Sequence, residues 1–160
     1  MTTVDAITPT VPPLSVLAES EREIAESVHQ FAVETIGPRS HAMDEANRID
    51  PELVRQFFDL DLMGIEIPEE YGGSGFSATA YCKMMEVIGP LDASAAIVVG
   101  AHQSIGIKPL LLFGTDEQKK KWLPDLATAK LVGAFCLTEP EAGSDAASLK
   151  TTAVYDPATD

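Results

Sequence analysis

The side chains best suited to chemistry lie together in residues 133–145, where an apolar run passes directly into a polar turn. The polar side chains of this stretch include Thr138, Glu139, Ser144 and Asp145. Such hydroxyl and carboxylate groups can bond a ligand, or they can brace the turn itself. Pro140 fixes one backbone dihedral angle and Gly143 permits a positive one, as in many ordinary turns. Taken alone, the stretch therefore leaves a ligand site and a purely structural turn both open.

No other stretch carries a recognisable catalytic or metal-binding pattern. The loop Gly72–Gly75 fits neither common phosphate-binding motif and follows no strand, so a tight turn between helices is the favoured interpretation. The three histidines lack the spacing of metal ligands. His102 lies in a strongly apolar stretch, which predicts a hydrogen-bonded core histidine rather than a catalytic one. We therefore assign no catalytic residue and no metal ligand.

The composition is that of a folded, acidic protein. Asp and Glu number 25 against 11 Lys and Arg, and the net charge of -14 disfavours binding to nucleic acid or to anionic membranes. Cys82 and Cys136 accompany no CxxC or Cys/His cluster, which indicates reduced thiols. Residues 1–13 resemble neither a secretory signal nor a transit peptide, and no apolar run approaches the ~20 residues that span a bilayer. We expect a cytoplasmic protein without a membrane span.

The first half of the chain predicts a flexible arm and then two amphipathic helices. Residues 1–13 are rich in Pro and Thr and show no apolar periodicity. Apolar residues from Leu14 onward follow a helical spacing that should end at Gly37–Pro38. A second helix should begin with Asp50 as N-cap and Pro51 in its first turn, and its apolar stripe ends at Gly64.

Apolar helices dominate the sequence from residue 76 to about residue 129. Runs at 76–88 and 93–113 are separated by Gly89–Pro90, and the second is apolar on nearly every face, which predicts a central, buried helix. Gly106 and Pro109 mark the places where that helix could break. Thr115 and Gln118 have the spacing of a capping box for one more helix.

The pattern changes to that of strands after residue 130. Residues 131–137 and 151–155 are rich in strand-forming types, and residues 156–160 have the composition of a turn. The predicted fold class is mainly α: a helical domain over residues 14–130, followed by the first strands of an incomplete β-domain over residues 131–160.

The order of these features resembles the acyl-CoA dehydrogenase family along nearly the whole chain beyond residue 15. The matching stretches are Pro68–Gly73, Phe113–Lys119, Trp122–Pro124 and, as the specific signature, Phe135–Asp145. Two further stretches, Ala101–Gly106 and Phe135–Pro140, are most similar to the very-long-chain branch of the family.

The resemblance implies an FAD-dependent enzyme that introduces an α,β double bond into a fatty acyl-CoA thioester. A carboxylate removes an α-proton while the β-hydrogen passes as hydride to the flavin, whose electrons then leave to an electron-transfer flavoprotein. It also implies a mainly α N-terminal domain of the family's type and a homo-oligomeric enzyme. The catalytic glutamate of the family has no match here, so we expect this chain to be inactive alone.

Position by position, the resemblance implies that Phe135, Cys136, Leu137 and Thr138 contact the isoalloxazine ring, with Thr138 as the side-chain hydroxyl donor. Gly143 lets the backbone approach the cofactor, and Ser144 contacts both flavin and acyl-CoA. Glu139 and Asp145 are expected to brace the turn. Residues 91–107 are expected to line part of the acyl tunnel.

Two other interpretations stay open at the level of sequence. An acyl-CoA oxidase, which reoxidises its flavin with O₂, differs from a dehydrogenase mainly in residues that this chain does not contain. A non-catalytic helical interaction module that retains the signature is the third possibility, although an unpaired strand end would be an aggregation hazard for such a module.

Overall fold

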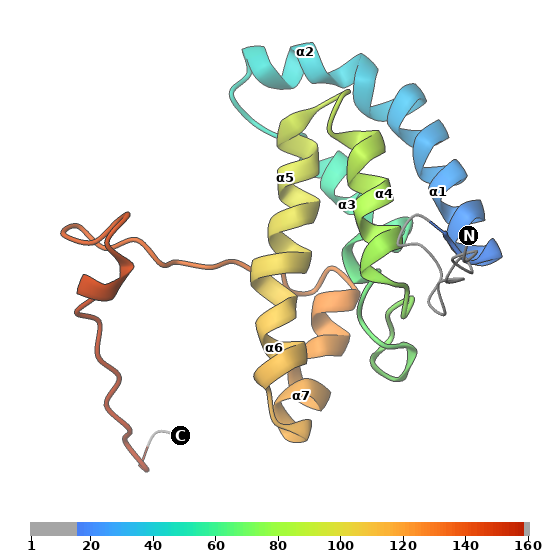
Figure 1. Ribbon diagram of the computed structural model, residues 1–160. Coiled ribbons are helices and arrows are strands. Elements are labelled where there is room, and N and C mark those ends of the chain that lie inside the picture. The colour runs from blue at the N-terminus through green and yellow to red at the C-terminus, as the bar shows by residue number, and fades with distance from the viewer. Residues whose placement is uncertain (1–15, 159–160) are drawn as a thin grey trace, which may run out of the picture.

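The structure, a computed structural model, describes residues 16–158, and the arm predicted for residues 1–13 lies outside this range. Helices pack side by side through residues 19–127, here called the helical body, and the chain then leaves them as an extended C-terminal segment, residues 133–158 (Figure 1). The α-helices are α1 (Glu19–Phe31), α2 (Gly37–Glu45), α3 (Pro51–Asp59), α4 (Ala78–Ile88), α5 (Ala93–Ala101), α6 (Lys108–Phe113) and α7 (Asp116–Ala127). The shorter turns are the π-helical η1 (Ala32–Ile36) and η4 (His102–Ile107), and the 3-10 turns η2 (Leu62–Gly64), η3 (Glu69–Tyr71) and η5 (Ala146–Ser148). The predicted mainly α architecture is confirmed.

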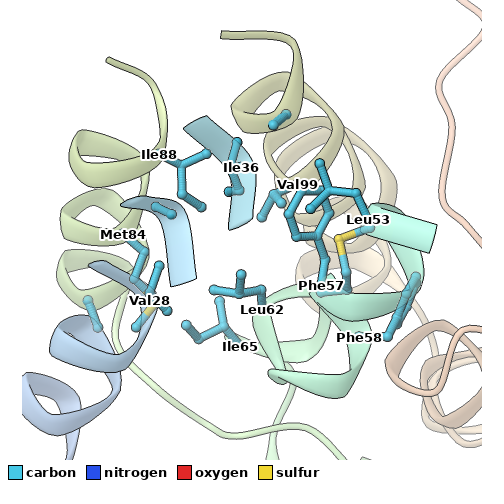
Figure 2. Packing of buried hydrophobic residues seen from close by; sticks show 14 of the residues in the cluster. Val28, Ile36, Leu53, Phe57, Phe58, Leu62, Ile65, Met84, Ile88 and Val99 are labelled. Carbon is cyan, nitrogen blue, oxygen red and sulfur yellow. The ribbon is translucent and has the colours of Figure 1, made fainter. Parts of the chain in front are cut away.

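The main core lies between α1, α3, α4 and α5, where their apolar stripes meet (Figure 2). Val28, Phe57 and Met84 are fully buried there, and the Phe31 and Phe57 rings meet edge to face at 6.2 Å between centroids. Burying such side chains is the main favourable contribution to folding, at about 1.5–3 kcal/mol for each. A second, smaller cluster packs α7 against the loop before α4 and the last helical turns before α6; its buried members are Ile67, Ile107, Leu123, Leu126 and Ala127.

Side-chain oxygens cap four of the helices as local sequence dictates. The Asp50 carboxylate accepts the Glu52 N–H at 2.9 Å, and Thr115 and Gln118 form the predicted reciprocal capping box. Ser77 and Asp92 cap α4 and α5 in the same manner. The helix that begins at Asp50 ends at Asp59 rather than at Gly64, because Asp61 takes a left-handed conformation with φ of 56°.

Two π turns carry helices past prolines that the sequence suggested as breaks. A proline in an α-helix lacks the N–H for the carbonyl four residues earlier, and its ring collides with that carbonyl. In η1 the Gly37 N–H instead donates to the Ala32 carbonyl, five residues back, one residue before Pro38. The prediction that the first helix ends at Gly37–Pro38 is therefore wrong, since the chain continues helically through α2. The turn η4 carries the helix past Pro109 in the same way.

The long helical stretch Ala93–Phe113 is buried on one side only, not on nearly every face as predicted. Val99, His102 and Ile107 are fully buried, whereas Ile97 is 67% exposed and Phe113 is 85% exposed. This stretch of 21 residues, with mean hydropathy 1.4, is the one helix among the described residues long and apolar enough to cross a membrane. Those two properties alone are weak evidence for a span, because its buried side binds carbonyls of the helical body through His102 and Gln103.

The glycine-rich loop before α4 is a tight turn, as predicted. The Gly75 N–H donates to the Ile67 carbonyl at 2.9 Å, and the Phe76 N–H donates to the Ile65 carbonyl at 2.8 Å. Gly73 lies so close to the backbone of Ile67 that an added Cβ would stand 2.2 Å from the Ile67 carbonyl oxygen. Only glycine fits at residue 73, so close backbone packing accounts for this glycine without any bound phosphate.

Neither predicted strand is paired in a sheet among the described residues. Residues 131–137 and 151–155 are extended but belong to no sheet, and the C-terminal segment contains only an isolated bridge between Glu139 and Ala142. A strand is stabilised by a ladder of hydrogen bonds to a neighbour, and the described residues supply no neighbour for either stretch. The extended backbone agrees with the prediction, while the strand assignments themselves are not supported.

Glu21 joins the N-termini of two helices. Although it lies in α1, its carboxylate accepts the Ser77 N–H at 2.9 Å at the start of α4, and also the Ala18 N–H at 2.9 Å. The bonds from Ser77 and Ala18 lower the pKa of Glu21 below its ordinary value of 4.5. The folded state thus takes up a proton less readily than the unfolded state, so this stabilisation is present above pH 4.5 and lost as the pH falls through the folded pKa.

We therefore expect Glu21→Gln to lower the free energy of unfolding at pH 7 by about 1.5–3 kcal/mol, the range for a hydrogen bond to a charged group. Urea denaturation at several pH values measures the difference, which should shrink as the pH falls through the folded pKa of Glu21 and the wild-type carboxyl becomes protonated too. Glu23→Gln, on the exposed face of the same helix, is the control. An equal loss in both variants, or a difference independent of pH, would contradict the assignment.

Candidate functional site

An apolar groove runs between α4 and α5 on the surface of the helical body. It is shallow and open to solvent, has a volume of about 360 Å³, and is lined by Tyr81, Met85, Ala96, Ile97, Gly100 and Ala101. Gly100 and Ala101 keep the floor low, because neither side chain extends beyond a methyl group. Tyr81 is half-buried at its edge, and burial raises the pKa of its phenol, so the hydroxyl stays neutral. The groove can accept a narrow apolar chain.

The predicted cofactor residues Phe135, Cys136, Leu137 and Thr138 follow one another along the exposed first part of the C-terminal segment. Phe135 is 53% exposed and Leu137 is 42% exposed. Among the described residues, no partner receives a hydrogen bond from the backbone N–H groups of residues 134–138. This stretch therefore offers a row of free donors beside exposed apolar side chains.

Glu139 closes the turn that follows. Its carboxylate accepts the Lys150 N–H at 2.8 Å, the Thr151 N–H at 2.8 Å and the Thr151 hydroxyl. The bonds from Thr151, followed by that from Lys150, lower the pKa of Glu139. Glu139 and Ala142 also exchange backbone hydrogen bonds across the turn. Glu139 braces the loop from residue 139 to residue 151 rather than facing outward as a free acid.

Asp145 has a comparable local role, because it directly precedes η5 and its carboxylate accepts the hydroxyl of Ser148 at the end of that turn. Gly143 and Ser144 are exposed on the loop closed by Glu139, and an added Cβ at Gly143 would meet nothing within 4 Å. The structure thus presents the six residues Phe135, Cys136, Leu137, Thr138, Gly143 and Ser144 on one braced segment. None of these six residues is hydrogen-bonded to a residue that lines the groove.

His102 is the residue whose importance the sequence underestimates. It is fully buried, as predicted, and its Nε2 lies 3.0 Å from the Leu126 carbonyl oxygen. Its Nδ1 accepts the Gly133 backbone N–H at 2.8 Å, at the point where the C-terminal segment leaves the helical body. A histidine within an apolar run predicts burial, but no local signal identifies partners that lie 24 and 31 residues away.

The exposed segment fits the chemistry of a flavin ring. An isoalloxazine ring has flat apolar faces and a row of oxygen and nitrogen acceptors along its pyrimidine edge. Phe135 and Leu137 can supply apolar contact, while the Thr138 hydroxyl and the free N–H groups of residues 134–138 can supply donors. In residues 16–158, no three His, Cys, Asp or Glu side chains gather closely enough to hold a metal ion.

Glu139→Gln should release the loop, because an amide offers only one acceptor oxygen where the carboxylate serves Lys150 and Thr151 together. Amide NMR should show the Thr151 resonance shifted and its hydrogen exchange accelerated several-fold, whereas the exposed neighbour variant Glu141→Gln should leave both unchanged. In the wild type the pKa of Glu139 is lowered, so the carboxylate stays ionised and keeps these bonds at pH values above its ordinary pKa of 4.5. The bonds are lost as the pH falls through the folded pKa of Glu139. An unchanged Thr151 amide in Glu139→Gln would contradict this assignment.

Known proteins share both the sequence and the fold of this chain. Residues 18–130 match the family profile described as acyl-CoA dehydrogenase, N-terminal domain. Over 141 residues the chain is 42% identical to the mitochondrial very long-chain specific acyl-CoA dehydrogenase of Bos taurus, covering 82% of this chain and 22% of that protein.

Two solved structures agree with this match. The butyryl-CoA dehydrogenase of Megasphaera elsdenii is 32% identical with a TM-score of 0.78, covering 85% of this chain and 36% of that one. The acyl-CoA dehydrogenase of Bacillus anthracis complexed with FAD is 36% identical with a TM-score of 0.74, covering 83% and 23%. This chain spans only 22% of the length of the bovine protein. The family profile, the sequence identity and the fold together show that the chain belongs to the acyl-CoA dehydrogenase family.

Proposed function

We propose that this chain is the N-terminal portion of an FAD-dependent acyl-CoA dehydrogenase that acts on fatty acyl-CoA thioesters, of the very-long-chain branch. The observation that carries the proposal is the row of free backbone donors and exposed apolar side chains at residues 134–138. These exposed N–H groups have no partner among the described residues, so they are available to a bound partner. The FAD complex of the Bacillus anthracis relative supports the choice of flavin.

Within this proposal, Phe135, Cys136, Leu137 and Thr138 hold the isoalloxazine ring. FAD supplies, when bound, an acceptor for the hydride that leaves the β-carbon of the acyl chain. Backbone N–H groups and the Thr138 hydroxyl stabilise negative charge at the pyrimidine edge, and they do so without reorganisation because the bracing by Glu139 fixes the following turn. Gly143 lets the backbone come close, and Ser144 contacts both the flavin and the acyl-CoA.

The groove between α4 and α5 receives the acyl chain in this proposal. Its lining is apolar, and its walls come from the residues 91–107 predicted to line the tunnel, together with α4. No carboxylate lines the groove among the described residues, so the group that removes the α-proton is assigned outside this chain. We accordingly expect the chain alone to be inactive.

Electrons are proposed to leave to an electron-transfer flavoprotein, and the complete enzyme is proposed to be a homo-oligomer, as the family resemblance implies. The domain boundary at residue 130 and the cytoplasmic location also stay predictions. The bovine relative is a mitochondrial protein by name.

The proposal is tested on the complete enzyme, purified with FAD and assayed for dehydrogenation of a sixteen-carbon acyl-CoA with an artificial electron acceptor. We expect Ser144→Ala to lower kcat/KM about tenfold, the effect of one hydrogen bond worth ~1.4 kcal/mol. Asp145→Asn should lower it less than about threefold, because Asp145 bonds Ser148 of its own loop. Equal losses, or a larger loss in Asp145→Asn, would contradict the roles assigned to the two residues.

A further inference from the structure

One helical stretch carries both the groove and the attachment point of the C-terminal segment. Ala101 lines the groove, and the next residue, His102, accepts the Gly133 N–H. Beyond Gly133, no hydrogen bond or ion pair joins residues 134–155 to the helical body in the described part of the chain. Figure 1 shows the chain leaving from beside this stretch and then running away from the helices. Gly133 is therefore the place that decides where the candidate flavin residues begin.

The imidazole of His102 bridges two separate segments in one defined tautomer. Because the Gly133 N–H donates to Nδ1, that nitrogen carries no proton, and Nε2–H donates to the Leu126 carbonyl. The ring is fully buried, and Phe58 meets it edge to face at 5.5 Å between centroids. A buried ring with both nitrogens bonded has one orientation, so the Gly133 amide has one position.

Two glycines allow the C-terminal segment to approach closely enough for this bond. A Cβ added to Gly106 would stand 2.9 Å from the Cα of Gly133, and a Cβ added to Gly133 would stand 2.8 Å from the Cα of Gly106. Both distances are shorter than a carbon–carbon contact permits, and both neighbours are backbone atoms that cannot turn aside. Neither φ angle is positive, so the glycines are required for closeness and not for backbone conformation.

The close contact between Gly106 and Gly133 is here called the crossing, and the chain that leads to it is also fixed. After α7 the chain turns at Ala129, whose φ is 63°, and the Leu131 N–H donates to the Asp125 carbonyl at 3.0 Å. One residue separates Leu131 from Gly133, and one residue separates Gly133 from Phe135. An extended residue spans about 3.3–3.6 Å, so the crossing sets the position of Phe135 to within a short reach.

We propose that His102, with the Gly106–Gly133 crossing, is a positioning residue that fixes the point beside the acyl groove from which the flavin-holding residues 135–138 extend. The proposal rests on the proposed function, since it concerns where the cofactor residues begin relative to the substrate groove. This starting point matters because misplacement of reacting groups by about 1 Å can cost on the order of a hundredfold in rate. His102 touches neither ligand in this account and acts through the backbone of Gly133.

Two variants of His102 separate its two hydrogen bonds. In His102→Asn the amide oxygen stands near the position of Nδ1 and can still accept the Gly133 N–H, whereas the bond to Leu126 is lost. In His102→Gln the amide nitrogen reaches the position of Nε2 and can still donate to Leu126, whereas the bond to Gly133 is lost. Each variant loses one buried bond and some volume, so both should lower the unfolding temperature by similar amounts.

The first measurement uses amide hydrogen exchange of the 160-residue chain by NMR and involves no flavin. The Gly133 amide should be protected in the wild type and in His102→Asn, and its exchange should rise at least tenfold in His102→Gln. Gly106→Ala, which pushes Gly133 away while leaving the imidazole intact, should also expose that amide. Gly37→Ala is the matched control, because a Cβ there meets only ordinary contacts at 3.6 Å and 3.7 Å. Loss of protection in both His102 variants or in neither, or in Gly37→Ala, overturns the inference.

The second measurement is FAD affinity of the complete enzyme, followed by flavin fluorescence. FAD binding should weaken at least about tenfold in His102→Gln and in Gly106→Ala, and less than about threefold in His102→Asn. Equal FAD affinity in the two His102 variants, despite exposure of the Gly133 amide in one, overturns the positioning role. If the wild-type enzyme bound no FAD while its Gly133 amide was protected, the proposed function would fail, and the bond from Gly133 to His102 would stand.

Discussion

A proline cannot donate the backbone hydrogen bond that a continuous helix requires, and the way the chain meets this constraint at Pro109 shapes the rest of the structure. In the π turn η4 the Lys108 N–H donates to the Gln103 carbonyl five residues back, which accommodates the absent N–H of Pro109. The stretches α5 and α6 therefore remain one helical stretch of 21 residues. That stretch packs one side onto the core, lines the groove with Ala101, and presents His102 and Gly106 to the departing chain. A break at Pro109 would detach the end of α6 from the part of the stretch that carries Ala101, His102 and Gly106, whereas the π turn keeps α5 and α6 on one helical element.

Carboxylates organise this acidic protein through its backbone more than through ion pairs. Asp50, Asp92, Glu21 and Glu139 each accept backbone N–H groups at the start of a helix or across a loop. Bonds of this kind satisfy donors that would otherwise stay unpaired at helix N-termini, where the helix dipole also favours negative charge. The salt bridges, by contrast, are mostly between exposed side chains, where each contributes little. The net charge of -14 is thus partly structural rather than a guide to a partner.

Structural features that involve neighbouring residues could be predicted from the sequence, whereas features that depend on distant partners could not. The caps at Asp50 and Thr115 and the tight turn at Gly73 involve residues within a few positions of one another, and each was predicted. The end of the first helix was misplaced, because Pro38 read alone indicates a break and the π turn before it has no clear sequence signature. The stretches 131–137 and 151–155 are unpaired among the described residues, because a strand depends on a neighbour that local composition does not reveal. The burial of His102 was predictable, whereas its bond to Gly133 required the packing of α7 beside α6.

The central claim is that residues 135–138, held in place at Gly133, contact a flavin. A crystal structure of the complete enzyme with FAD tests it most directly. The account predicts the Thr138 hydroxyl and backbone N–H groups of residues 135–138 within hydrogen-bond distance of the isoalloxazine ring, with the Gly133 amide still bonded to His102 Nδ1. A flavin bound elsewhere, with those N–H groups paired to a neighbouring strand, would contradict it.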